Sequence, residues 1–118
     1  MKTKVDDLSN EQLNKLTAKA CKWCQVSEFY LVDEDGNAVL DGVRNEPTTN
    51  DAQAMWLVKE FGVEIEPTKF DENGNVTEWV ATTWIDVTSY KFTSSDLNHA
   101  ICKAVVASVF GDEVEVGK

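Results

Sequence analysis

The sequence predicts an α+β fold in which residues 1–118 form a single domain, with helices packed on a mostly antiparallel sheet in an α-β-α sandwich-like arrangement. Three segments carry apolar residues at helical spacing. Two turns that contain Gly and Asn join short runs of strand-forming residues. The predicted order is helix, hairpin, helix, antiparallel strands and helix, and we expect helices on both faces of the sheet.

The first helix is expected to run from about residue 10 to residue 24. Ser9 stands three residues before Gln12, which is the spacing of a capping box at a helix start. An apolar stripe with helical spacing then follows, formed by Leu13, Leu16, Ala20 and Trp23 or Cys24.

A β-hairpin and a second helix are predicted next. Segments 29–32 and 38–40 are rich in strand formers, and the turn 33–37 between them contains Gly and Asn. The second helix should end at Gly62, because glycine is favoured just after a helix C-terminus. Three polar residues could cap its start, namely Thr48, Thr49 and Asn50.

The longest strand-forming stretch, residues 76–87, is predicted to be a central strand covered on both sides, because apolar residues occur at both its odd and its even positions. The strand before it, residues 63–66, should reach its end or a sheet edge at Pro67, which cannot donate a ladder hydrogen bond. Asn73-Gly74 predicts a hairpin turn between the two strands.

The last helix is expected to begin after Ser94 or Ser95 and to end at Gly111. Tyr90 and Phe92 indicate one more strand before it. Residues 112–118 are expected to form an acidic C-terminal tail that frays.

The charge balance is strongly acidic. The chain has 21 Asp and Glu against 11 Lys and Arg, which gives a formal net charge of -10. A nucleic-acid-binding protein of the usual basic kind is therefore not expected, and we predict no direct contact with nucleic acid. No apolar run approaches the roughly 20 residues of a membrane span, and the first residues do not resemble a signal peptide, so no membrane association is expected.

Several motifs together resemble a known family. Residues 1–9 and the segment Leu16-Thr-Ala-Lys-Ala20 open the likeness, and the helix entry from Pro47 to Trp56 continues it. The segment Phe61-Gly-Val-Glu-Ile65 and the Trp79-Val-Ala81 step follow. The most specific part is the closing segment Asn98–Val116, which contains Ala-Ile-Cys-Lys-Ala and Phe-Gly-Asp-Glu-Val.

In these motifs the chain resembles the NinX-type phage proteins and the related phage α-β-α sandwich domain, a family of unknown function. The likeness is weakest over residues 24–46, and Leu97-Asn-His99 replaces the Pro-Leu that precedes the family's last helix. The resemblance implies a small phage or prophage protein that acts in the host cytoplasm. It supplies no catalytic residues.

A metal site is one hypothesis from the residues themselves. Cys21 and Cys24 are three residues apart on the expected first helix, and His99 and Cys102 have the same spacing on the last. If the two helices pack side by side, these four could form a tetrahedral Cys3His zinc site, which would make the chain a zinc-stabilised regulatory or interaction module. The alternative is that the three cysteines are core residues, because free cysteine behaves as a small hydrophobe. We favour core cysteines and expect no metal and no cofactor.

Cysteine chemistry and catalysis have weaker support. An odd number of cysteines indicates a reducing cytoplasm without a disulfide framework. Cys21-Lys-Trp-Cys24 is not expected to be a redox motif, since the C-terminal end of a helix disfavours a thiolate. With one histidine, no nucleophile motif and no Gly-rich phosphate loop, the sequence predicts a protein that is not an enzyme.

The acidic turns are the expected partner-binding residues. A net charge of -10 on a small domain attracts basic surfaces, so the predicted partner is a host or phage protein with a basic surface. The expected contact residues lie in the two hairpin turns and are Asp33, Glu34, Asp35, Asp71 and Glu72. Neither turn has the Gly and Glu positions of a calcium-binding loop.

Three roles fit this acidic interaction protein. It could be an accessory protein that binds and modulates a host protein, in its sharpest form an anti-CRISPR-like inhibitor of a host defence nuclease. It could be the zinc-stabilised module, or a virion or assembly component. If the long strand is covered on one face only, either Trp79 or Trp84 is exposed, which would predict a partner patch or a homo-oligomer.

Overall fold

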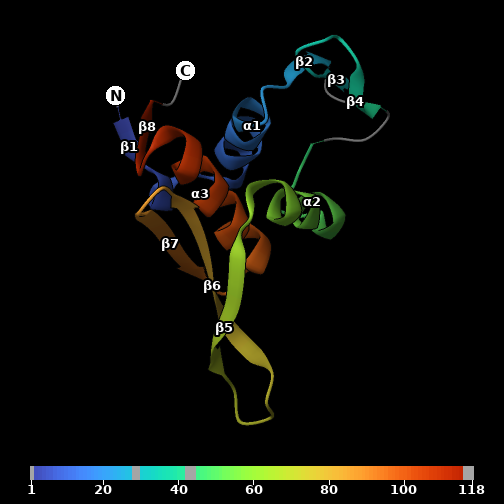
Figure 1. Cartoon of the computed structure of the whole chain (residues 1–118). Coiled ribbons are helices and arrows are strands. Elements are labelled where there is room, and N and C mark those ends of the chain that lie inside the picture. The colour runs from blue at the N-terminus through green and yellow to red at the C-terminus, as the bar shows by residue number, and fades with distance from the viewer. Residues whose placement is uncertain (1, 28–29, 42–44, 116–118) are drawn as a thin grey trace.

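The computed structural model describes residues 2–27, 30–41 and 45–115. The three helices are α1 (Asn10–Ala20), α2 (Asp51–Phe61) and α3 (Leu97–Phe110), and a short 3-10 turn, η1 (Val5–Asp7), precedes them. The strands are β1 (Lys2–Lys4), β2 (Cys24–Ser27), β3 (Tyr30–Val32), β4 (Ala38–Asp41), β5 (Glu64–Phe70), β6 (Val76–Ile85), β7 (Thr88–Ser94) and β8 (Glu113–Glu115). The predicted α+β class is confirmed (Figure 1).

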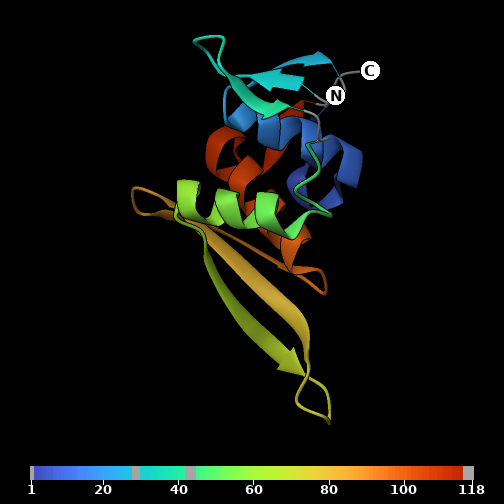
Figure 2. The same ribbon diagram turned by 90° about the vertical axis from the view of Figure 1, so that its right-hand side faces the viewer.

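Every sheet in the described chain is antiparallel. β5, β6 and β7 form a three-stranded sheet with β6 in the middle, as predicted for the longest strand. β2, β3 and β4 form a second three-stranded sheet, and β1 pairs with β8. Figure 2 shows the helices between the β2–β4 sheet at the top and the long β5–β6 hairpin, which projects away at the bottom.

Helix α3 is the centre of the core. All eight residues from Ala100 to Ala107 are buried, including Lys103. The helix packs against α1, α2, η1, β6, β7 and β8. The Lys103 ammonium lies 2.8 Å from a carboxylate oxygen of Asp6 in η1, which gives this buried charge the partner that it needs.

Helix α1 begins as predicted and ends earlier than predicted. Ser9 and Gln12 form the capping box, with each side chain bonded to the other residue's backbone N–H. The helix stops at Ala20 because Lys22 adopts a left-handed conformation with φ 63°. The N–H groups of Lys22 and Trp23 then donate to the carbonyls of Lys19 and Ala18, which is a Schellman ending.

The other two helices end at the predicted glycines. Asn50 caps α2, and Gly62 follows it in the left-handed conformation that glycine adopts without steric cost. Gly111 ends α3. The residue that caps the start of α3 is Asp96, and not Ser94 or Ser95 as predicted. The Asp96 carboxylate accepts the N–H groups of Asn98 and His99.

The helices do not lie on both faces of the β5–β6–β7 sheet, so that detail of the expected sandwich is wrong. The inner face carries Ala81, Phe92 and Thr83, and the Thr83 hydroxyl donates to the Ala104 carbonyl of α3 over 2.8 Å. Among the described residues, no helix packs on the outer face, where the Trp84 side chain is 52% exposed. Pro67 lies in the edge strand β5, as its missing N–H requires.

The C-terminal residues are more ordered than expected. Glu113–Glu115 form β8 and pair with Lys2–Lys4, so the expectation that this part of the 112–118 tail frays is wrong. Val114 is buried beside the core, which gives the pairing an apolar anchor. Residues 116–118 lie outside the described chain.

Within the same described ranges, none of the helices has the length and apolar character needed to cross a lipid bilayer.

Truncating the centre of α3 should test this core. Ile101→Ala removes a side chain with no exposed surface, and we expect it to lower the free energy of unfolding by about 2–5 kcal/mol. Val109→Ala is the matched control on the same helix, because Val109 is exposed and its truncation should change stability by less than about 0.5 kcal/mol. Urea unfolding at pH 7 measures both. Equal losses in the two variants would contradict the central position of α3.

Candidate interaction surfaces

The two acidic turns have the same local structure. In each, the first aspartate accepts two backbone N–H groups through one carboxylate oxygen: Asp33 from Asp35 and Asn37, and Asp71 from Asn73 and Asn75, all at 2.9 Å. Asp33 and Asp71 therefore hold the turns in shape. The remaining predicted contact residues, Glu34, Asp35 and Glu72, are exposed.

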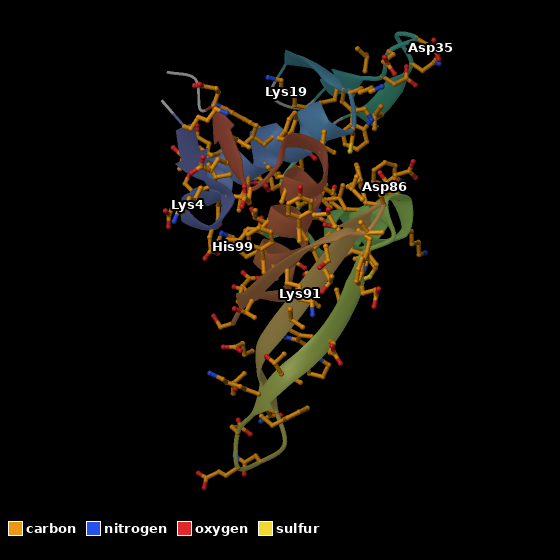
Figure 3. All side chains as sticks on the ribbon, turned by 60° about the vertical axis from the view of Figure 1, so that its left-hand side comes forward. Lys4, Lys19, Asp35, Asp86, Lys91 and His99 are labelled. Carbon is orange, nitrogen blue, oxygen red and sulfur yellow. The ribbon has the colours of Figure 1, made fainter. Side chains whose placement is uncertain are left out.

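The structure does not bring the two turns together. The β3–β4 turn and the β5–β6 turn lie at opposite ends of a molecule whose longest dimension is 47 Å (Figures 1 and 2). Figure 3 shows Asp35 at one end and the β5–β6 tip at the other. The five predicted residues therefore form two separate acidic tips and not one surface.

The β5–β6 hairpin projects beyond the helices and carries excess negative charge. Residues 64–85 contain five acidic residues and one lysine, namely Glu64, Glu66, Asp71, Glu72, Glu78 and Lys69. Lys69 is paired with Glu78 at 3.4 Å. Phe70, beside the tip, is 59% exposed. The hairpin thus presents carboxylates and an aromatic side chain to solvent.

The outer face of the β5–β6–β7 sheet contains a hollow of about 240 Å³. The strand register places Glu64 opposite Thr82, Thr82 opposite Lys91, and Glu66 opposite Val80. Alternate residues of a strand share a face, so Trp84 lies on this face beside Thr82. The lining consists of Glu64, Ile65, Glu66, Val80, Thr82, Trp84 and Lys91.

One aromatic and four polar side chains define the chemistry of this hollow. The Trp84 indole N–H donates to a Glu64 carboxylate oxygen over 2.8 Å. Thr82 is only 7% exposed, and its hydroxyl has no hydrogen-bond partner among the described residues. Within the same described ranges, Glu66 and Lys91 likewise have no ion-pair partner. Lys91 lies midway along the sheet, away from Asp86 at the β6–β7 turn (Figure 3).

A second pocket, also of about 240 Å³, lies between α1, α2 and β4. Its walls are mostly apolar, and Trp23 and Trp56 meet there with ring centroids 5.1 Å apart. The Asn14 side chain in α1 accepts the N–H and the hydroxyl of Thr48, which ties the segment before α2 to α1. Two of the four tryptophans therefore pack together, and Trp84 is the exposed one of the pair on β6.

The cysteines and the histidine do not form the hypothesised zinc site in the described part of the chain. Cys21 lies at the end of α1, and Cys102 is buried in α3. His99, labelled in Figure 3, is at the start of α3. Among the described residues, no three His, Cys, Asp or Glu side chains converge in a way that could hold a metal ion. The Cys24 backbone is in β2, so Cys21 and Cys24 do not share a helix, and the Cys24 side chain lies outside the described part.

Both described thiols are protonated at neutral pH. Burial raises the pKa of Cys21 to about 12, with a further contribution from the nearby Glu60 carboxylate. Burial also raises the pKa of Cys102 to about 12, with a smaller contribution from Asp96. Such thiols are poor nucleophiles and poor metal ligands, because both roles require the thiolate.

Comparison with known proteins identifies a fold relative. No family model and no curated protein matches the chain. A crystal structure of a phage protein from Bacillus cereus ATCC 14579 is similar, with a TM-score of 0.62 and 19% sequence identity over 88% of this chain and 95% of that one. The chain therefore shares its fold with a phage protein. Membership of the NinX-type family stays a prediction.

The outer-face hollow was not predicted from sequence. Glu64 and Glu66 alternate along their strand, which indicates a shared face. The Asn73-Gly74 turn could have set the register that places Thr82 opposite Glu64. The two bulges in the β5–β6 pairing lie between Pro67 and Phe70 and shift that register. Counting residues back from the turn therefore gives the wrong pairing.

Thiol labelling should reveal the raised cysteine pKa values. In a Cys24→Ser variant at pH 8, we expect iodoacetamide to alkylate Cys21 in the folded protein about a thousandfold more slowly than in urea, because raising the pKa from 9.0 to about 12 cuts the thiolate fraction by that factor. Mass spectrometry after timed quenching measures the rates. Equal rates in the two states would contradict the burial of this thiol.

The contribution of the Asp71 turn to the stability of the protein should depend on pH. The backbone N–H of Asn75 donates to the Asp71 carboxylate and holds its pKa below the usual 3.8, a shift that desolvation partly opposes and the N–H of Asn73 reinforces. A pKa depressed by folding stabilises the protein above the unfolded pKa of about 3.8, and this contribution is lost as pH falls through the folded pKa.

We therefore expect Asp71→Ala to be less stable than the wild type at pH 6 and the two proteins to converge below pH 3.8. Urea unfolding across this range measures the difference, with Glu72→Ala as the control because the Glu72 side chain holds no turn hydrogen bond among the described residues. A constant difference between wild type and Asp71→Ala at all pH values would contradict this role.

Proposed function

We propose that the chain is a small phage accessory protein, without catalytic activity of its own, that binds a host protein with a basic surface in the host cytoplasm. The observation that carries this proposal is the projecting β5–β6 hairpin with its excess carboxylates. Its acidic tip contains Asp71 and Glu72, and Phe70 is exposed beside it. A charged rim around an aromatic side chain is the composition of many protein interfaces.

The phage origin rests on two supports of different kinds. The fold is shared with a phage protein of Bacillus cereus at 19% identity. The closing segment Asn98–Val116 resembles the NinX-type phage proteins, and we propose membership of that family. Both supports concern the setting of the protein, and neither names a partner.

In its sharpest form, the proposal is that this protein inhibits a host nucleic-acid-binding enzyme, such as a defence nuclease, in the manner of an anti-CRISPR. A net charge of -10 repels nucleic acid and attracts the basic groove in which such an enzyme holds its substrate. An acidic hairpin that projects from the domain can enter a groove that a flat acidic face cannot. The predicted outcome is competition with nucleic acid for one basic surface.

Affinity capture from host lysate tests the proposal. With the tagged protein, we expect one dominant nucleic-acid-binding protein at 0.1 M salt and its loss at 1 M, where the Debye length falls from about 10 Å to about 3 Å. Added single-stranded and double-stranded DNA should compete for the captured protein. Capture that resists both salt and nucleic acid would contradict binding through charge.

A matched pair of variants locates the contact. Glu72→Gln and Glu34→Gln each remove one exposed carboxylate, at opposite ends of the molecule. We expect Glu72→Gln to weaken partner binding about two- to fivefold, the range for an exposed ion pair, and Glu34→Gln to leave it unchanged. Surface plasmon resonance with the captured partner measures both. The reverse order would move the contact to the β3–β4 turn.

A further inference from the structure

We infer that the hollow on the outer face of the β5–β6–β7 sheet is a receptor for an arginine side chain of the partner protein. The hollow is defined by Glu64, Glu66, Thr82, Trp84 and Lys91, and none of these belongs to the two acidic turns. The inference rests on the proposed function, because it gives the basic partner one specific anchoring residue. It goes beyond that function by naming a site and a chemical group.

Trp84 provides the aromatic surface of the receptor. Its side chain is 52% exposed, and Trp84 pairs with Ser89, one residue pair in from the end of the β6–β7 hairpin. The 2.8 Å hydrogen bond from its indole N–H to Glu64 restricts rotation of the ring. An indole held in place with an accessible face attracts a cation through its π electrons, and arginine is the most frequent partner in such contacts.

Two acceptors remain unused inside the same hollow. The Glu66 carboxylate has no ion-pair or hydrogen-bond partner among the residues that the structure describes. The Thr82 hydroxyl is part of a side chain that is more than nine-tenths buried, and within that same set it also lacks a hydrogen bond. No fully buried side-chain oxygen among the described residues lacks a hydrogen bond, so the Thr82 hydroxyl reaches the open space of the hollow, where it is available to a ligand.

A guanidinium group matches this arrangement better than an ammonium group. It is planar, so it can stack on the Trp84 indole, and its N–H groups form a fork that fits the two oxygens of the Glu66 carboxylate. A remaining N–H can donate to the Thr82 hydroxyl. An ammonium group is a strongly hydrated point charge that cannot stack and donate side by side in the same way.

Lys91 sets the limit of the site. It lines the side of the hollow opposite β5, where its positive charge opposes a bound cation. The three charged side chains of the hollow therefore leave a single net negative charge, which suits one arginine and not a run of basic residues. The repulsion between Lys91 and a bound cation provides a further test, because removing the lysine charge should raise the affinity for arginine.

The test uses the full chain and two blocked tripeptides, Gly-Arg-Gly and Gly-Lys-Gly, in titrations followed by ¹⁵N NMR. The Trp84 indole N–H resonance is assigned from the signal missing in Trp84→Phe. We expect this resonance to shift saturably with the arginine peptide and at least about threefold less tightly with the lysine peptide, since only the guanidinium can stack and bridge.

Four variants then separate the site from general acidity. We expect Glu66→Gln to weaken the arginine peptide about fivefold, and Thr82→Val to weaken it by a smaller factor. Lys91→Met should strengthen it about two- to threefold. Glu72→Gln is the control, since it removes the same charge as Glu66→Gln outside the hollow and should leave the affinity unchanged. Each variant's ¹⁵N spectrum also checks that it is folded.

Three outcomes would overturn the site. Equal affinity for the two peptides, shifts centred on residues 71–75 with Trp84 unmoved, and equal effects of Glu66→Gln and Glu72→Gln would each indicate diffuse attraction by surface acids. The first two would leave the proposed function standing, because partner capture and the Glu72→Gln and Glu34→Gln pair test it without the hollow. Salt-resistant capture together with saturable arginine binding would instead overturn the proposed function and leave the arginine site standing.

Discussion

The architecture depends on the need to cover α3 on every side. The eight residues from Ala100 to Ala107 are all buried and only Lys103 among them is charged, and a helix that is apolar on nearly every side must be enclosed. The inner face of the β5–β6–β7 sheet covers one side, and α1, α2 and η1 cover others. All the helices are used in this enclosure, so the outer face of that sheet stays open to solvent.

The same constraint explains why helices lie on only one face of the β5–β6–β7 sheet, where the sequence predicted them on both. Apolar residues at both odd and even positions of β6 indicated a strand covered on two faces. The odd positions, Ala81 and Thr83, do face α3. The even positions instead form the hollow, where Thr82 is buried by neighbouring side chains without any helix. An exposed but locally packed face and a face under a helix give the same pattern in sequence.

Local chemistry was predictable where the preferred residue stands at the required position. The Ser9 capping box, the Asn50 cap and the left-handed Gly62 all follow from side-chain and backbone preferences within four residues. The end of α1 was not predictable in this way. Its left-handed residue is Lys22, and a lysine carries no sequence signal for that conformation. Trp23 and Cys24 continue the helical stripe by chance, which extended the predicted helix past its end.

The site required information that local patterns do not hold. The acidic turns were placed correctly on their hairpins, but the separation of the two hairpins into different sheets depends on how α1 and α3 pack. The five residues that define the hollow come from three strands, and only the register aligns them. Composition could indicate an acidic domain. It could not indicate which carboxylate lies beside an indole.

The two edges of the β5–β6–β7 sheet are protected in different ways against pairing with another chain. Lys91 is the middle residue of β7, which forms one of these edges. Pro67 interrupts the donors along β5, whereas β7 has an uninterrupted backbone from Thr88 to Ser94. Two copies that joined antiparallel along β7 about its middle residue would bring Lys91 against its own counterpart. Like charges at such a position discourage edge-to-edge growth. The lysine that lines the hollow is therefore also a guard against polymerisation through the sheet.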